Sequence, residues 1–185
     1  MEHEHNVSVR EEYRRMTFLE LAEKRYSCRS ISDRPVEEEK ITKILRSAQL
    51  APTACNLQPF KIWVIDKEAD VEKIKMTTRG TFGAHLFFVV GADKSQGWNR
   101  KYDGRNFADV DASIVATHMM MEIEDLGLAT TWVGSFDNLK LAELFPMMEG
   151  YDLVAIFPVG YATEDAKPMD LHEKTKSLDE LVVRV

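Results

Sequence analysis

The chain has 185 residues, of which 44% are hydrophobic and 30% are charged, as in ordinary globular proteins, so a fibrous or wholly disordered chain is excluded. Its 24 basic and 31 acidic residues give a formal charge of −7. Such a charge argues against general binding to nucleic acid, because that binding requires a basic surface.

The beginning of the chain predicts a short leader followed by one domain. Residues 1–14 carry charge without periodicity, so we expect a flexible leader and a single domain over residues 15–185. Thr17 and Glu20 form a capping-box pattern that predicts the start of a first helix. The polar N-terminus has no signal-peptide core, and we expect a cytoplasmic protein.

Neither a membrane span nor a metal or disulfide framework is predicted. The longest apolar run, 86–92, is far shorter than the ~20 residues that cross a bilayer. The two cysteines, Cys28 and Cys55, lack the spacing of a metal site and do not make a disulfide scaffold.

The rest of the chain alternates between apolar strands and amphipathic helices. A second helix is predicted to start at Pro35, which is tolerated at a first helical position, and to stop at Pro52. Strands are expected at 60–65, 86–92, 128–133 and 153–159, and further helices at 68–77, 107–127 and 137–145. This interleaving predicts a three-layer α/β or α+β domain.

Two apolar features need a surface to cover them. The helix expected from Phe107 is apolar around much of its circumference and contains Met119, Met120 and Met121. A central core helix and a helix shared between the core and a dimer interface are equally good interpretations, because an apolar helix must be buried somewhere. The chain also ends in an apolar segment, 178–183, which would fit a sheet edge.

The turn after the first helix carries groups suited to an anionic ligand. Alternation in an extended segment would direct Arg25, Ser27 and Arg29 to one side. Guanidinium groups beside a hydroxyl suit a phosphate or the electron-poor edge of a flavin or nucleotide ring. A solvated basic turn balanced by Glu23 and Asp33 is the alternative interpretation.

Two further segments are candidates for ligand contact. In the sequence A-P-T-A-C-N-L-Q-P-F at 51–60, Asn56 and Gln58 offer donors and acceptors that match an imide-like edge such as a pyrimidine. An ordinary turn that satisfies its own backbone is the alternative. In the segment 126–136, Gly134 follows a predicted strand and would let a backbone amide approach a ligand closely.

Together these segments resemble the small nitroreductase family of FMN-dependent oxidoreductases. The matching stretches are the R-x-S-x-R turn, the A-P-T-x-x-N-x-Q-P-F loop, the G-L-x-T-T-W-V-G-S-F strand, Tyr102-Asp103-Gly104, Asp111-Ala112-Ser113 and Val159-Gly160-Tyr161. They span roughly residues 17–183. No single motif is specific, but their joint occurrence points to this family.

The resemblance implies a fold and an assembly. It implies an α+β fold, a nitroreductase-like three-layer sandwich in which a mostly antiparallel sheet is flanked by helices. It also implies a domain-swapped homodimer, in which the C-terminal strand joins the sheet of the partner subunit and two FMN sites lie at the interface. Such a dimer would cover both apolar features of the chain.

The resemblance also implies a set of cofactor-binding residues. They are Arg25, Tyr26, Ser27, Arg29, Pro52, Thr53, Ala54, Cys55, Asn56, Gln58, Trp132, Val133, Gly134, Ser135, Lys174 and Lys176. The first group would hold the FMN phosphate and the pyrimidine side of the ring. The group at 52–56 matches a loop supplied by the partner, the group at 132–135 lies against the flavin, and the two lysines match a basic pair at the phosphate.

The implied activity is hydride transfer in a ping-pong cycle. NADH or NADPH would reduce FMN, and an electron-poor small molecule, nitroaromatic or quinone-like, would then accept the electrons. The chemistry is centred on the flavin, so no residue of the chain is assigned as catalytic. A non-catalytic FMN-binding or sensing protein and a flavin-fragmenting or dehalogenating relative are the alternatives.

Overall fold

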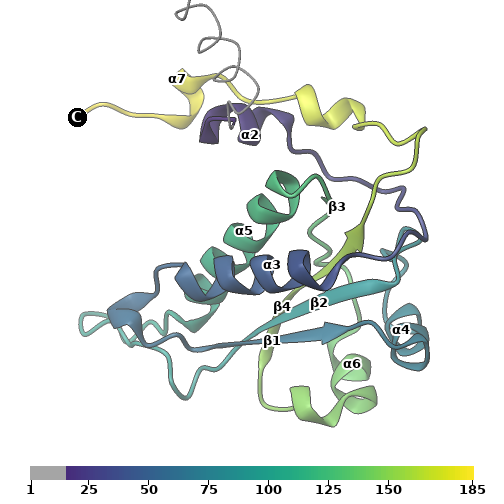
Figure 1. Cartoon of the computed structure of the whole chain (residues 1–185). Helices are drawn as coiled ribbons and strands as arrows, with labels where there is room; N and C mark the ends of the chain where they lie inside the picture. The colour runs from purple at the N-terminus through teal and green to yellow at the C-terminus, as the bar shows by residue number, and fades with distance from the viewer. Residues whose placement is uncertain (1–15) are drawn as a thin grey trace, which may run out of the picture.

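The computed structural model describes residues 16–185 and contains one four-stranded sheet (Figure 1). The predicted leader, 1–14, lies outside the described residues. The strands are β1 (Phe60–Ile65), β2 (Leu86–Ala92), β3 (Ala129–Thr130) and β4 (Asp152–Gly160). Their order is β1-β2-β4-β3 and every pairing is antiparallel, so β1 and β3 form the edges of the sheet.

Helices cover both faces of the sheet and make a three-layer α+β sandwich, which confirms the predicted fold class (Figure 1). One face carries α3 (Glu38–Leu50) and α5 (Ala108–Asp125), and the other carries α4 (Glu68–Lys75) and α6 (Asn138–Leu144). All seven residues of β2 are buried, because alternate side chains enter the two layers. Phe88 belongs to the first layer and Phe87 to the second.

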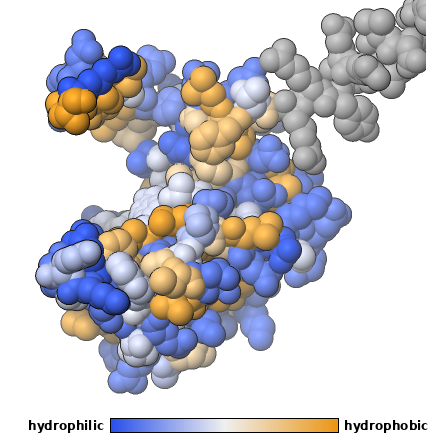
Figure 2. Space-filling model, turned by 90° about the vertical axis from the view of Figure 1, so that its left-hand side faces the viewer, coloured by the Kyte–Doolittle hydropathy of each residue, from blue (hydrophilic) through white to orange (hydrophobic). Residues whose placement is uncertain are grey.

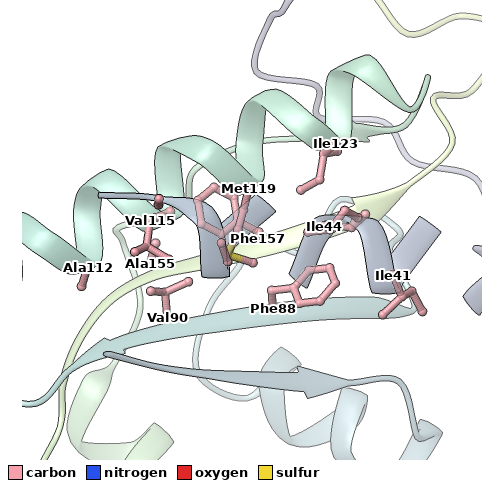
Figure 3. Close-up of a cluster of buried hydrophobic side chains, with 14 of the residues drawn as sticks. Ile41, Ile44, Phe88, Val90, Ala112, Val115, Met119, Ile123, Ala155 and Phe157 are labelled. Carbon is pink, nitrogen blue, oxygen red and sulfur yellow. The ribbon is translucent and has the colours of Figure 1, made fainter. Parts of the chain in front are cut away.

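The larger core cluster fixes α5 against the sheet (Figure 3). Its members include Ile41 and Ile44 of α3, Phe88 and Val90 of β2, Ala112, Val115, Met119 and Ile123 of α5, and Ala155 and Phe157 of β4. Burial of each large apolar side chain contributes about 1.5–3 kcal/mol. Met119 is fully buried, which confirms a core role for this part of the methionine run, whereas Met120 and Met121 are only half-buried.

Local capping signals set two helix starts as predicted. Before α2 (Phe18–Lys24), the Thr17 hydroxyl accepts from the amide of Glu20 at 3.3 Å, and the Glu20 carboxylate accepts from the Thr17 amide at 2.6 Å. Before α6, the Asp137 carboxylate accepts from the amide of Lys140 at 2.9 Å. Within residues 16–185, no helix has both the length and the hydropathy needed to cross a membrane.

The predicted start of the second helix at Pro35 is wrong, because α3 begins at Glu38. Glu37 has an extended backbone, with φ −67° and ψ 137°. Its carboxylate accepts from the Tyr161 hydroxyl at 2.5 Å and from Arg34 at 3.1 Å. These contacts engage Glu37 with segments outside the helix, and the helix starts after it.

The predicted strand 128–133 is also wrong in extent. Only β3, two residues long, pairs continuously with β4, and a single isolated bridge joins Val133 to Ile156. Between them the ring of Trp132 packs edge-on against Phe157, with 5.3 Å between centroids. The register is the same on both sides of this gap, and in it Thr131 faces Pro158, which has no backbone N–H to donate to the ladder.

The C-terminal segment lies across the top of the molecule beside α2 (Figure 1). It contains two short helices, η3 (Asp170–Glu173) and α7 (Leu178–Leu181), and residues 182–185 pair with no strand among the described residues. Leu178 and Val183 are 76% and 84% exposed. Figure 2 shows apolar side chains on this upper part and a hollow below it. Exchange of the segment with a partner stays a prediction.

Two other short helices complete the elements of residues 16–185. They are η1 (Ala54–Asn56), which precedes β1, and η2 (Pro146–Met148), which follows α6.

Candidate functional site

A cavity of about 860 Å³ opens beside the β3 edge of the sheet. Its lining comes from three separate parts of the chain: Arg29, residues 75–80 and 82 at and after the end of α4, and the segment 131–137 after β3. This volume lies in the range of small-molecule sites, roughly 300–1,000 Å³.

The turn that carries Arg29 is held between two neighbours. The amide of Cys28 donates to the carbonyl of Thr130 at 3.0 Å, and the amide of Ile31 donates to the carbonyl of Phe82 at 2.9 Å. Cys28 is 1% exposed, so alternation of side chains directs Arg29 outward to the cavity. Of the three residues that the predicted alternation directs to one side, only Arg29 lines the cavity of the described chain.

The other two walls of the cavity are tied to each other. The Thr78 hydroxyl donates to the carbonyl of Ser135 at 2.8 Å. Gly80 lies so close to Val133 that an added Cβ would be 2.9 Å from Cγ1 of Val133. A glycine is therefore required for this approach, and the two segments form one continuous wall.

The cavity has an excess of cationic side chains in an acidic protein. Arg29, Lys75 and Arg79 line it, and Asp137 is the one acidic residue in the described lining. Lys75 pairs with Glu72 at 2.6 Å, whereas Arg29 and Arg79 form no ion pair with residues 16–185. Guanidinium groups without an ion-pair partner bind phosphate and carboxylate well, so the cavity suits an anionic ligand.

The backbone at Gly134 is open to that ligand. A Cβ added at Gly134 would meet no atom within 4 Å. The peptide groups of this segment are therefore accessible to a flat group lying against them.

Five of the residues predicted from the sequence meet in the cavity. They are Arg29, Trp132, Val133, Gly134 and Ser135. Arg25, Tyr26 and Ser27 belong to the same turn as Arg29 but do not line the cavity of the described chain. Burial, with a hydrogen bond to Cys28, raises the pKa of Tyr26 to about 12, so its phenol is protonated at neutral pH.

The two predicted lysines lie in the tail and do not line the cavity. Lys174 and Lys176 are exposed. They follow His172, whose ring contacts the ring of Tyr26 edge-on with 6.3 Å between centroids. The tail therefore passes beside the turn that carries Arg29.

The predicted loop at 52–58 lies at the other edge of the sheet. It leads into β1, whereas the cavity is lined by residues 131–137, which follow β3. The strands β2 and β4 lie between these two edges. The described chain therefore does not bring Pro52, Thr53, Ala54, Cys55, Asn56 or Gln58 to its own cavity.

The segment 75–80 was missed as part of the site. The sequence T-T-R-G at 77–80 combines a cation, hydroxyls and a glycine directly after a helix, which is a signal for anion contact. The segment lines the cavity because Thr78 contacts Ser135, which is 57 residues away. No local sequence pattern predicts that contact.

Comparison of this sequence with known proteins identifies one protein family. A model described as the nitroreductase family matches residues 22–82 and 75–161. A Methanothermobacter thermautotrophicus protein named "Putative NADH dehydrogenase/NAD(P)H nitroreductase" is 30% identical over 166 residues, which cover 86% of this chain and 84% of the relative.

Solved structures agree with this assignment. The crystal structure of a nitroreductase family protein from Clostridium difficile 630 has a TM-score of 0.84 and 38% identity, with 91% of this chain and 98% of that chain covered. A "putative nitroreductase in complex with FMN" from Exiguobacterium sibiricum shares the fold, with a TM-score of 0.78, 19% identity, and coverage of 92% and 98%. The chain therefore belongs to the nitroreductase family of oxidoreductases.

Proposed function

We propose that this protein is an FMN-dependent NAD(P)H oxidoreductase that acts as a homodimer and reduces an electron-poor small molecule, such as a nitroaromatic or a quinone. The observation that carries the proposal is the cavity in which Arg29, Lys75 and Arg79 meet the open backbone at Gly134. The family relatives named for NAD(P)H and the FMN complex of a protein with the same fold support it.

The residues of the cavity fit FMN. The guanidinium of Arg29, with Arg25 and Ser27 from the same turn, would hold the phosphate through charge-assisted hydrogen bonds, which are roughly twice as strong as neutral ones. The side-chain-free backbone at Gly134 would lie against the ring. When bound, FMN supplies the group that takes a hydride from NADH or NADPH and passes electrons to the acceptor.

The remaining cations set the electrostatics of the pocket. Arg79 and Lys75 place positive charge in the same cavity as Gly134, and this charge favours an anionic ligand over a neutral one. The contact between Gly80 and Val133 holds the backbone beside Arg79 against the segment that carries Gly134.

Two features support a homodimer. The loop at 52–58 presents Cys55, Asn56 and Gln58 to solvent beside the β1 edge of the sheet, and none of them lines the cavity of the described chain. The apolar C-terminal segment lies beside α2 at the top of the molecule (Figure 1), and Phe18 and Leu19 of α2 are exposed. A second copy would cover these side chains and bring the loop of one chain to the cavity of the other.

The test is a visible absorption spectrum of the purified protein, followed by addition of NADH, and separately NADPH, without oxygen. We expect a bound-flavin spectrum that bleaches with at least one of the two donors. A flavin spectrum that persists with both would favour a binding or sensing role and contradict the oxidoreductase cycle. Failure to bind supplied FMN would overturn the site itself.

A further inference from the structure

The carboxylate of Asp111 is buried and does not line the cavity. It is 2% exposed and lies in the first turns of α5, between the fully buried Ala108 and Ala112. One oxygen, Oδ1, accepts from the amide of Ala54 at 2.9 Å. The other, Oδ2, has no hydrogen-bond partner within residues 16–185. Buried polar atoms without partners are rare in proteins and call for an explanation.

The segment bonded to Asp111 has an unfavourable backbone. Cys55, Asn56 and Gln58 have φ values of 51°, 52° and 51°, in the left-handed region that non-glycine residues adopt only at a cost. Such conformations persist only where the surroundings impose them. Something outside the local sequence must therefore hold the loop 53–58.

Local hydrogen bonds account for only part of that restraint. The Thr53 hydroxyl accepts from the amide of Gln58 at 3.0 Å, and the Gln58 side chain donates to the carbonyl of Gln49 at 3.2 Å. Among the described residues, the bond from Ala54 to Asp111 is the only hydrogen bond that links 53–58 to an element far away in the sequence.

The helix that carries Asp111 is a firm support. Val115 and Met119 on the same helix are fully buried in the core against the sheet (Figure 3). A carboxylate fixed in this way can impose a conformation on a loop that only touches it.

We propose that Asp111 is a positioning residue that holds the loop 53–58 in its strained shape, so that Cys55, Asn56 and Gln58 are presented to the cofactor site of a second copy. The proposal rests on the proposed function for the identity of that site. Asp111 acts through the amide of Ala54 and does not line the cavity.

The first test measures amide hydrogen exchange in the full-length protein without added cofactor. Asp111→Ala removes the acceptor, and we expect exchange at residues 54–58 to accelerate at least tenfold while the amides of α5 near Met119 keep their protection. Asp111→Asn keeps an acceptor oxygen for the Ala54 amide, and we expect it to restore slow exchange. The matched control is Asp109→Ala, which removes an exposed carboxylate two residues away.

The outcomes separate positioning from general stability. Unchanged loop exchange in Asp111→Ala, or an equal acceleration throughout the core, would overturn the proposal. Failure of Asp111→Asn to restore protection would also overturn it, because the oxygen acceptor is then not what holds the loop.

The second test is FMN titration of the same variants. We expect the Kd of Asp111→Ala to rise about tenfold, and those of Asp111→Asn and Asp109→Ala to stay within twofold of the parent. If the parent protein binds no FMN, the proposed function fails, while the exchange experiment still decides the role of Asp111. If the parent binds and Asp111→Ala binds equally well, the link between Asp111 and the cofactor is wrong.

Discussion

The two edges of the sheet are built in opposite ways. Beside β3, the walls of the cavity are tied by the bond between Thr78 and Ser135 and by the close approach of Gly80 to Val133. Before β1, the loop 53–58 is strained, and among the described residues Asp111 makes its only hydrogen bond to a distant element. One chain thus has a concave, well-braced half and a half that carries a strained loop.

The largest effect should come from the concave half. We expect Arg29→Ala and Arg25→Ala each to weaken FMN binding about 10- to 100-fold, because a hydrogen bond to a charged group contributes about 1.5–3 kcal/mol. Flavin titration measures this, with Arg46→Ala as the control, since Arg46 is exposed on α3 and bonds to Gln49. Unchanged affinity in both variants would remove the turn from the site.

Two glycines of the concave half should respond differently to the same added methyl group. Gly80→Ala would press on Val133, and we expect it to lower the free energy of unfolding by about 1–3 kcal/mol. Gly134→Ala meets no protein atom, so we expect stability to change by less than about 0.5 kcal/mol while FMN binding weakens. Urea unfolding and flavin titration separate the two. Gly134→Ala with full affinity would mean that no ring lies against this backbone.

The C-terminal lysines should contribute less to FMN binding than the turn that carries Arg25 and Arg29. We expect Lys174→Ala with Lys176→Ala to weaken FMN binding only several-fold, and the loss to shrink at high salt, because exposed charges are screened. Lys167→Ala, another exposed lysine of the same tail, is the control. An equal loss at low and high salt would argue against a charge contact with the phosphate.

The smallest effect concerns the start of α3. The Tyr161 hydroxyl, which donates to Glu37, lowers the pKa of that carboxyl from 4.5 to about 2. Because the pKa is lowered on folding, the contribution of Glu37 to stability is present above pH 4.5 and is lost as the pH falls toward 2. We therefore expect Glu37→Gln to lower the melting temperature slightly at neutral pH and not at pH 2. A difference that persists at pH 2 would contradict this.

Much of the framework is predictable from the sequence because its causes are local. The apolar run 86–92 and the strand 60–65 agree with β2 and β1 at both ends, and the capping residues Thr17 and Asp137 act within one helical turn. The start of α3 and the length of β3 are wrong because distant groups decide them. Tyr161 engages Glu37, and Pro158, which faces Thr131, lacks the backbone N–H that would continue the ladder.

The same distinction applies to the candidate site. Arg29 and the residues 132–135 are recognisable as motifs, and the structure brings them together. Thr78 and Arg79 lie in a segment that signals anion contact, but their place in this cavity depends on a contact across 57 residues, which the sequence does not show. Asp111 lies in one of the stretches that resemble the family, but no role is predicted for it, and its burial with one oxygen unpartnered among residues 16–185 is visible only in the structure. The loop at 52–58 stays a prediction until a dimer is observed.

The order of the strands has a consequence for aggregation. An unpaired strand edge can add a strand from any other chain, and natural proteins protect such edges. One edge here is β3, whose two residues offer too short a template. The other edge is β1, which carries the exposed Lys61, and a lysine on an edge strand disfavours unwanted pairing through charge repulsion and hydration. The chain thus protects one side of its sheet by brevity and the other by charge.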